Sequence, residues 1–476
     1  MVKMQCENAL GRRRFLGVAA GAMSGLWALD ALSQAPEGKR PPNLVLILID
    51  DIGAKELGCY GNTEHKTPVL DGMAAKGVFF QTAYAAPLCH PTRVMLMTGQ
   101  YGCHNGVYNF AGRRGGPAPD APVEDMTTHL TFAQLLKTRG YATALAGKWQ
   151  LSGAPPTQIF ECGFDEYSMW AYRHNIPKEA RHSGAMEDDE KTARYWNPSI
   201  VRNGTYIPTK PDDYGPDIEL AFLTDFAKRH KDEPLFLYWP MTLTHAPHQP
   251  TPDSRKEGET IEGKTHNPKN FTADVEYVDK LVGKLDAALG ELGVSGNTVF
   301  LVTGDNGTGG EGKGQVTELG ARVPMIAYGP GIVQQRGATD ELMDLSDIFP
   351  TLAGYSGASL PEGRPMDGKS LVPFLRGETE TTRDWIFSFL GDGRILRDKR
   401  WLLEDNTPHR FGRLYDCGHS RDGSGYKEVT GSNDPEALAA KKRFEKLLEQ
   451  LPAPEIPEEG DANDVKPERA ARRERK

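Results

Sequence analysis

Short apolar runs alternate with helical patterns from about residue 43 onward. The first run, Leu44 to Ile49, has no polar alternation, which is typical of a strand that is covered on both faces. Three similar runs follow at residues 142–146, 235–239 and 298–302. Because strands that alternate with helices build parallel sheets, this order predicts an α/β fold around a large, mostly parallel sheet.

Two of the intervening segments have the periodicity of helices. Apolar residues recur at helical spacing from Val275 to Leu292, and Gly293 follows as a stop signal. A second helix is expected from Phe132 to Arg139, where Gly140 ends the pattern. We expect both helices to cover the predicted sheet.

The pattern changes after about residue 380 to short apolar runs around turns. Residues 394–397 and 399–403 are two such runs, and they predict a small antiparallel sheet. From Pro452 the chain is rich in Pro, Glu, Lys and Arg and has almost nothing apolar, so it cannot offset the entropy of ordering.

A chain of 476 residues is longer than a single hydrophobic core usually serves. We therefore expect a main domain at residues 42–378, a C-terminal subdomain at 379–451 and a disordered tail at 452–476. Composition is that of a globular protein, with 38% hydrophobic and 25% charged residues. The net charge of −9 makes nucleic acid a poor candidate partner.

The first residues are interpreted as an export signal. Arg12 and Arg13 precede an apolar stretch that runs to Leu29, and a small-residue cleavage site ends at Ala35. This pattern predicts a signal peptide at residues 1–35 that resembles the twin-arginine type, hence a periplasmic or secreted protein that uses the twin-arginine export machinery. The alternative is an uncleaved anchor, but the apolar run is shorter than the ~20 residues of a spanning helix. No stable membrane insertion is expected.

Cysteine usage also carries information. Once Cys6 has left with the signal, an odd number of cysteines without CxxC spacing remains, so a zinc site is not expected. At least one thiol must stay unpaired in a monomer, and an unpaired thiol in an oxidising compartment indicates a specific role for that cysteine. The remaining cysteines are Cys59, Cys89, Cys103, Cys162 and Cys417.

Side chains that bind ions stand just beyond the four predicted strands. They are Asp50 and Asp51, Lys148, His245, and Asp305 and Asn306. Because ligands of open α/β sheets bind beyond the carboxyl ends of the strands, we expect these side chains to converge on one crevice. The aspartates and the asparagine offer only hard oxygen donors, which favour calcium or magnesium. The alternative is that each pair caps a turn or a helix.

The segment from Cys89 to Arg93 precedes a predicted helix with Pro91 in its first turn. Cys89 would then lie at the helix N-terminus, where backbone N–H groups favour an anion. Arg93 follows one turn later and can face the same side. The alternative is a buried structural cysteine.

Cys89-His90-Pro91-Thr92-Arg93, followed by Thr98-Gly99, resembles the signature of the sulfatases, in which a dedicated enzyme oxidises the cysteine to formylglycine. The resemblance covers nearly the whole chain after the signal, and the order and spacing of the matching segments are specific. These segments include Tyr60-Gly61-Asn62, Thr67-Pro68, Gly147-Lys148-Trp149, Thr244-His245-Ala246-Pro247-His248, Asp305-Asn306-Gly307, Glu318, Arg322-Val323-Pro324 and Leu414-Tyr415-Asp416.

The resemblance implies a sandwich of alkaline-phosphatase type that hydrolyses a sulfate ester. It implies that Cys89, once converted by a sulfatase-maturing enzyme, is the nucleophile: one hydroxyl of the formylglycine hydrate attacks sulfur, and the other later expels sulfate. Calcium, or magnesium, would be bound by Asp50, Asp51, Asp305 and Asn306. Arg93, Lys148, His245 and Lys313 would hold the sulfate, with His245 placed to protonate the leaving oxygen.

One position departs from the family pattern. Sulfatases commonly have histidine directly after Gly-Lys-Trp, whereas this chain has Gln150, which is expected to contact the nucleophile but cannot carry a proton. Two alternatives to a sulfatase stay open: the metal and the cations would also accept phosphoryl oxygens, which motivates the first, and Gln150 motivates the second. One is a phosphatase or phosphonate monoester hydrolase on the same fold, and the other is a non-catalytic protein that binds sulfated glycans.

The natural substrate is expected to be a sulfated small molecule or, more specifically, a sulfated carbohydrate. Residues 170–215 contain side chains that suit sugar stacking and charge recognition, although they could equally form a packed surface insertion. These side chains are Trp170, Tyr172, Arg173, His174, Tyr195 and Trp196.

Overall fold

The four predicted apolar runs form neighbouring strands in the middle of one large sheet. In the computed structural model, β1 (Asn43–Ile49) lies between β7 (Leu235–Pro240) and β8 (Thr298–Gly304), and β3 (Ala142–Gly147) lies beyond β7. All three pairings are parallel. The carboxyl ends of the four strands therefore reach the same edge of the sheet, as the sequence predicts.

The structure describes residues 40–110, 113, 116, 126–151, 157–171, 192–261 and 265–456. The signal predicted at residues 1–35 lies outside these ranges, as do residues 457–476 of the predicted tail. From Arg40 onward the chain forms one compact unit. Within the described ranges, none of the helices combines the length and the apolar character needed to cross a membrane.

The large sheet has eleven strands in the order β11-β2-β10-β8-β1-β7-β3-β4-β5-β6, with β9 paired to β2. Antiparallel pairings involve β10, β9, β5 and β6, so the sheet is mixed but mostly parallel at its centre. The strands not yet given are β2 (Val78–Tyr84), β4 (Glu166–Trp170), β5 (Ile200–Arg202), β6 (Thr205–Ile207), β9 (Arg322–Val323), β10 (Met325–Tyr328) and β11 (Gly337–Asp344).

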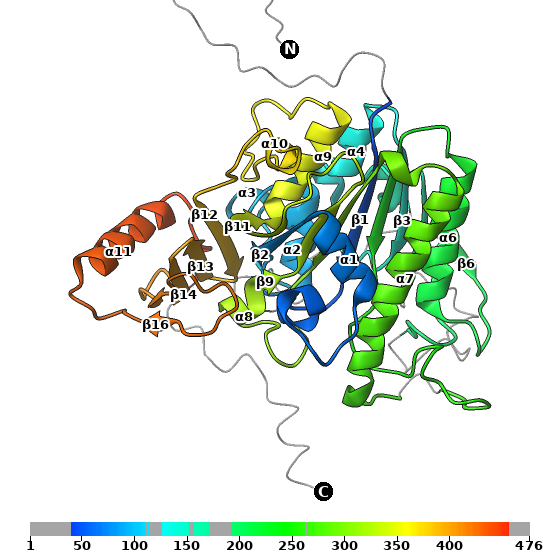
Figure 1. Cartoon of the computed structure of the whole chain (residues 1–476), viewed down its shortest axis with the longest axis horizontal. Helices are drawn as coiled ribbons and strands as arrows, with labels where there is room; N and C mark the ends of the chain where they lie inside the picture. The colour runs from blue at the N-terminus through cyan, green and yellow to red at the C-terminus, as the bar shows by residue number, and fades with distance from the viewer. Residues whose placement is uncertain are drawn as a thin grey trace, which may run out of the picture. The chain divides into compact units, whose positions relative to one another are not determined.

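Helices cover both faces of this sheet (Figure 1). In β1, Leu44, Leu46 and Leu48 pack into one apolar core and the alternate residues pack into another, as a strand buried on both sides requires. The first core also contains α2 (Cys89–Thr98), α4 (Phe132–Lys137) and α9 (Ile348–Ser356). The second contains α1 (Pro68–Lys76), α6 (Gly215–Arg229) and α7 (Phe271–Glu291). The predicted helices correspond to α4 and α7.

A separate antiparallel sheet of five strands follows, in the order β12-β13-β14-β15-β16. Its strands β13 and β14 contain the two short apolar runs, which confirms the predicted antiparallel sheet. Lys399 and Arg400, at the start of the second run, lie in the bend before β14. Its strands are β12 (Trp385–Leu390), β13 (Gly393–Asp398), β14 (Trp401–Asn406), β15 (Arg413–Asp416) and β16 (Lys427–Glu428). The remaining helices are α3 (Gly102–Asn105), α5 (Gln158–Glu161), α8 (Glu318–Ala321), α10 (Val372–Leu375) and α11 (Pro435–Leu448).

Candidate active site

Backbone hydrogen bonds tie together the carboxyl ends of the four central strands. The N–H of Asp305 donates to the last carbonyl of β1 (3.0 Å), and the N–H of Asp50 donates to the carbonyl of Leu243 (2.8 Å). The N–H of Lys148 donates to the last carbonyl of β7 (2.6 Å). Segments far apart in the sequence therefore meet at one point, and the predicted convergence is confirmed.

Three buried carboxylates at this edge each have a cationic partner. The pairs are Lys148 with Asp50 (2.7 Å between Nζ and Oδ2), Arg93 with Asp305 (2.6 Å between Nη2 and Oδ2) and Lys313 with Asp51 (2.6 Å between Nζ and Oδ1). Charges are stable in such a site only when they are paired or bind a ligand. All the side chains to which the resemblance gives a metal-binding or sulfate-binding role, except His245 and Asn306, take part in these pairs.

Asn306 completes the oxygen cluster. Its Nδ2 donates to Asp51 Oδ1 (3.0 Å), while its Oδ1 is buried and has no hydrogen-bond donor among the described residues. A buried carbonyl oxygen without a partner costs free energy, which a bound cation would recover. Since the cluster presents carboxylate and amide oxygens, the residues fit calcium or magnesium.

The ionisation of the carboxylates also fits a bound cation. Burial opposes charge on Asp50, but Lys148 and the other cations hold the pKa of its carboxyl well below the usual range. Burial and the neighbouring charge of Asp50 raise the pKa of Asp305 to about 7. A divalent cation in the cluster would favour the ionised form of Asp305.

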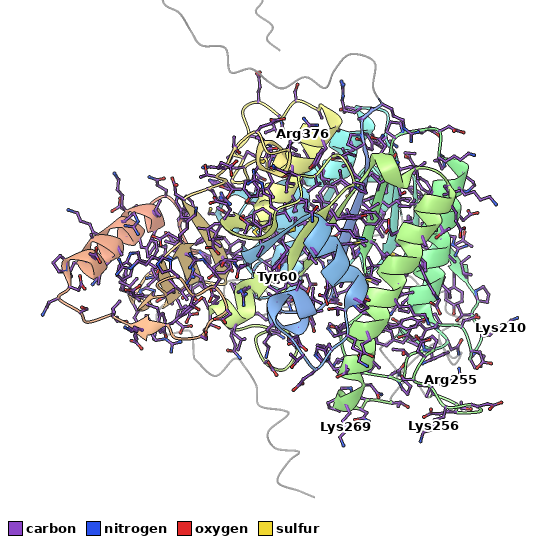
Figure 2. The ribbon with its side chains drawn as sticks, in the orientation of Figure 1. Tyr60, Lys210, Arg255, Lys256, Lys269 and Arg376 are labelled. Carbon is purple, nitrogen blue, oxygen red and sulfur yellow. The ribbon has the colours of Figure 1, made fainter. Side chains whose placement is uncertain are left out.

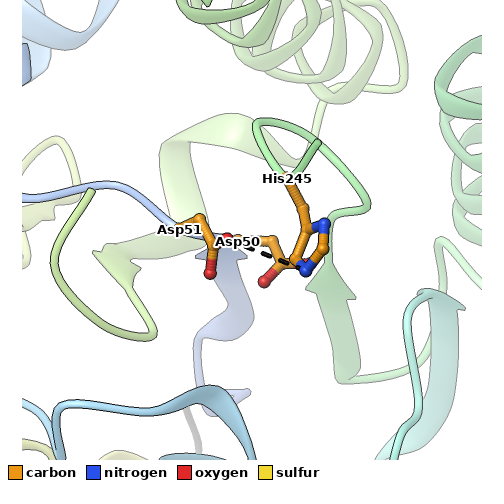
Figure 3. Close-up of side chains that lie close together, drawn as sticks. All are labelled: Asp50, Asp51 and His245. Carbon is orange, nitrogen blue, oxygen red and sulfur yellow. Dashed lines mark ion pairs between the residues drawn. The ribbon is translucent and has the colours of Figure 1, made fainter. Parts of the chain in front are cut away.

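His245 faces the same cluster from the loop that follows β7. Figure 3 shows its ring beside the carboxylates of Asp50 and Asp51, with 3.7 Å between His245 Nε2 and Asp51 Oδ2. Ligand atoms of these three residues all lie within 4.8 Å of one another. His245 Nδ1 lies 2.6 Å from the carbonyl of Ala246, an arrangement in which Nδ1 carries the proton and leaves Nε2 facing the site. Burial and the charge of Arg194 lower the pKa of His245 to about 3.

Cys89 is the first residue of α2, as the sequence predicts. Leu88 before it is extended, and Gly99 in the left-handed region ends the helix at φ 69°. Every residue of α2 is buried, so the N–H groups at its N-terminus face a site that is shielded from solvent. Burial raises the pKa of the Cys89 thiol, although Lys148 and Lys313 act in the opposite direction. The unmodified thiol is therefore a weak nucleophile.

Gln150 follows the strand end in a left-handed conformation, with φ 52°. Its carbonyl lies 3.1 Å from His90 Nδ1, which fixes the backbone beside α2. Its side-chain Oε1 is buried and has no hydrogen-bond donor among the residues that the structure describes. This oxygen can accept a hydrogen bond from a ligand but cannot transfer a proton.

The side chains of residues 170–215 that were predicted to recognise sugar lie partly within the described structure and partly outside it. Tyr195 and Trp196 are buried: the Tyr195 hydroxyl donates to the carbonyl of Thr242 (2.8 Å), and Trp196 Nε1 donates to the carbonyl of Pro250 (2.7 Å). Both therefore serve packing. Trp170 is the half-buried last residue of β4, whereas Tyr172, Arg173 and His174 lie outside the described ranges.

Sequence reasoning missed Arg194. Its Nη1 lies 3.9 Å from Asp50 Oδ2, and its guanidinium stacks on the ring of Trp170 at 4.1 Å from the centroid. No strand-end pattern marks this arginine, because it lies in an irregular segment well beyond β4.

Fold and site together define an α/β protein whose charged site lies at the carboxyl edge of a mostly parallel sheet. A family model described as Sulfatase matches residues 42–358. The chain is 32% identical to N-acetylgalactosamine-6-sulfatase of Canis lupus familiaris over 402 residues, which cover 78% of this chain and 73% of the relative. It is 32% identical to arylsulfatase A of Homo sapiens over 392 residues, which cover 76% and 73%.

The crystal structure of Ps i-CgsB in complex with k-i-k-neocarrahexaose has the same fold. The TM-score is 0.71 at 24% sequence identity, and the match covers 90% of this chain and 99% of that chain. The chain belongs to the sulfatase family and has its sandwich of alkaline-phosphatase type. It is a sulfuric ester hydrolase.

Proposed function

We propose that this sulfatase hydrolyses sulfate esters of carbohydrates, with a formylglycine made from Cys89 as its nucleophile. The proposal is supported above all by the position of Cys89 at the N-terminus of α2, where Lys148 and Lys313 are close enough to act on its ionisation. The metal is calcium, with magnesium as an alternative, and its ligands are Asp50, Asp51, Asp305 and Asn306.

Each cation of the site has a task in this proposal. Lys148 and Lys313 bind sulfate oxygens and offset the charge that builds up during transfer. Arg93 donates to both Asp305 and the carbonyl of Lys148, so it holds the metal-binding and sulfate-binding segments in register. The hydrate of formylglycine supplies the hydroxyl that attacks sulfur.

His245 delivers the proton that the leaving alcohol needs. Its low pKa means that the ring is neutral before substrate binds, because burial and Arg194 disfavour the imidazolium. A bound sulfate anion adds negative charge beside the ring and so raises its proton affinity. Substrate and proton therefore bind together.

A carbohydrate substrate is supported by the relatives. N-acetylgalactosamine-6-sulfatase is named for a sulfated sugar, and Ps i-CgsB was crystallised in complex with k-i-k-neocarrahexaose. Export by the twin-arginine route, predicted from Arg12 and Arg13, is part of the proposal. Conversion of Cys89 by a sulfatase-maturing enzyme in the cytoplasm would precede export.

The proposed nucleophile is tested by mass spectrometry of the peptide that contains Cys89, in protein produced with and without a maturing enzyme. We expect turnover of aryl and sugar sulfates to rise in proportion to the converted fraction. The control is Cys162, a buried cysteine at the C-terminus of α5, which should stay unmodified. Full activity with an unmodified thiol at Cys89 would overturn the mechanism.

Matched phosphate and sulfate esters test the nearest alternative enzyme. Faster turnover of the phosphate ester by fully converted protein would make this chain a phosphatase or phosphonate monoester hydrolase. No turnover of any ester, with formylglycine and calcium both present, would favour a protein that only binds sulfated glycans.

A further inference from the structure

Arg194 is a largely buried cation at the site, and one of its nitrogens has no hydrogen-bond partner among the described residues. Its side chain is 11% exposed, and Nη1 is buried without an acceptor among the described residues. The 3.9 Å to Asp50 Oδ2 is too long for a hydrogen bond. Asp50 is already engaged by Lys148, at 2.9 and 2.7 Å to its two oxygens. Arg194 is therefore not needed to neutralise Asp50.

The position of Arg194 is fixed from two sides. Its guanidinium lies on Trp170, the last residue of β4, and β4 is parallel to β3, so both strands end at the edge that carries Lys148. Its carbonyl packs against Gly215 at the start of α6, where an added Cβ would come within 2.2 Å of that oxygen. The neighbouring Tyr195 is bound to the carbonyls of Thr242 and His245. Arg194 is thus held in place before any ligand binds.

A fixed guanidinium N–H in a buried site needs an acceptor, because leaving it unpaired costs about 1–3 kcal/mol or more, and an anionic oxygen forms the strongest such bond. The anion that enters this site is the sulfate group of the substrate. Guanidinium groups suit such tetrahedral oxyanions because their N–H groups match the spacing of the oxygens.

We infer that Arg194 binds an oxygen of the sulfate group undergoing transfer, as a further cationic donor beside Asp50. This inference rests on the proposed function. Lys148 binds Asp50 directly, whereas Arg194 lies near Asp50 with an N–H that has no acceptor within the described ranges and can donate it to the sulfate.

The experiment compares Arg194→Ala and Arg194→Lys with wild type in converted, calcium-loaded protein. We expect Arg194→Ala to lower kcat/KM on an aryl sulfate by about 10²–10³-fold, as for loss of one donor to a developing oxyanion. The concentration of inorganic sulfate that halves activity should rise by about tenfold or more, since product and substrate share this contact. Arg194→Lys should restore kcat/KM and sulfate inhibition only in part, because lysine keeps the positive charge but lacks the planar guanidinium group.

Calcium affinity separates sulfate binding from a role in the metal site. Arg194→Ala removes a cation next to Asp50, so calcium binding should be unchanged or tighter. A change in calcium affinity with sulfate inhibition within about twofold of wild type would overturn the inference.

Arg255 offers a matched control. It stacks on Trp196 at 4.4 Å from the centroid and pairs with Asp212, and Figure 2 places it at the periphery of the molecule. Arg255→Ala should leave kcat/KM unchanged. An equal loss of kcat/KM in Arg194→Ala and Arg255→Ala would show that Arg194 contributes through packing and not through a contact with sulfate. Inorganic sulfate binding to calcium-loaded Cys89→Ala protein, with and without Arg194→Ala, tests the contact even if wild type turns over no ester.

Discussion

At the scale of single residues, the two side chains that differ most in proton chemistry are His245 and Gln150. His245 has a ring nitrogen directed at the site, whereas the amide of Gln150 offers an unsatisfied oxygen that does not titrate. In the proposed mechanism, proton transfer to the leaving alcohol therefore falls on His245, and Gln150 orients a hydroxyl.

These different roles predict that substitution of His245 lowers kcat/KM more than substitution of Gln150. We expect His245→Ala to lower kcat/KM by about 10²–10⁴-fold, the usual contribution of general acid catalysis, and Gln150→Ala to lower it by about tenfold or less. The measurement is kcat/KM of both variants on one sulfate ester, with aryl leaving groups of rising basicity. The His245→Ala defect should grow as the leaving group becomes more basic, since such groups need the proton more.

Gln150→His completes the comparison, because it restores the usual residue of the family. Equal losses in His245→Ala and Gln150→Ala would contradict the assignment. Inactive wild type that gains turnover through Gln150→His would favour the non-catalytic alternative.

At the scale of elements, the proposed metal site depends on the ends of β1 and β8 lying side by side. Asp51 N–H donates to Asp305 Oδ1 (3.0 Å), so each strand end positions the other. Removing divalent cations should abolish activity, and calcium or magnesium should restore it while zinc alone should not, because the ligands are hard oxygens. Asp305→Ala should lose both bound metal and activity.

Elemental analysis and activity measured on the same preparations provide the test. Asp217→Ala is the control, since the described partner of that carboxylate is the Tyr277 hydroxyl on the neighbouring helix α7 (2.8 and 3.0 Å). Retention of metal and activity by Asp305→Ala would show that the four oxygen ligands do not act as one site.

Sequence patterns predicted four central strands of the large sheet but not β2 and β10, which lie beyond β8. Leu44 to Ile49 is apolar throughout because both faces are covered, so its pattern is unambiguous. β2 has a buried pattern interrupted at Phe79 and Gln81, and the four-residue β10 is antiparallel, so neither resembles a central parallel strand. Tertiary pairing, rather than local pattern, forms these elements.

The same limit applies to the site. Asp50, Lys148 and Asp305 lie directly at strand ends, so topology alone predicts that they meet. Arg194 reaches the cluster from an irregular segment, and only the packing of Trp170 and Gly215 places it there. Nothing in the local sequence encodes that contact.

Helix α6 carries a buried carboxyl whose ionisation should make stability depend on pH. Glu219 is buried, and burial raises its pKa to about 7 although Trp239 and Thr242 donate to it (2.9 and 3.0 Å). The folded state then keeps a proton that the unfolded chain releases above the usual pKa of 4.5. Stability from this group is fully present below that pKa and falls as pH rises toward 7.

Glu219→Gln should remove this dependence, because an amide can accept from Trp239 and donate to Thr242 without ionising. Its free energy of unfolding should exceed that of wild type by up to about 3 kcal/mol at about pH 8, and the difference should vanish near about pH 4. Urea unfolding at several pH values checks this. A difference that does not change with pH would mean that Glu219 does not titrate abnormally.

At the scale of the whole molecule, the small sheet shares its core with the large domain. One apolar cluster contains Phe80 of β2 and Leu96 of α2 together with Leu396 of β13 and Leu403 of β14. The hydroxyl of Ser388 in β12 also donates to the carbonyl of Ala85 (2.6 Å). Because the two sheets bury apolar surface against the same residues, we expect them to unfold in a single transition.

A buried ion pair should dominate the polar part of this junction. Arg397 of β13 is fully buried, with 3.8 Å between its Nη1 and Glu318 Oε1 of α8, and Tyr84 of β2 donates to the same oxygen (2.6 Å). Arg397→Met would leave the Glu318 carboxylate buried without its cation, which typically costs about 3–5 kcal/mol.

The matched control is Arg400→Met, whose exposed pairs with Asp416 and Glu436 should contribute no measurable stability. Urea unfolding followed by tryptophan fluorescence and by circular dichroism measures both variants and tests for a single transition. If Arg397→Met is as stable as Arg400→Met, the junction is held by apolar packing alone, and the charge pair between the sheets contributes nothing to folding.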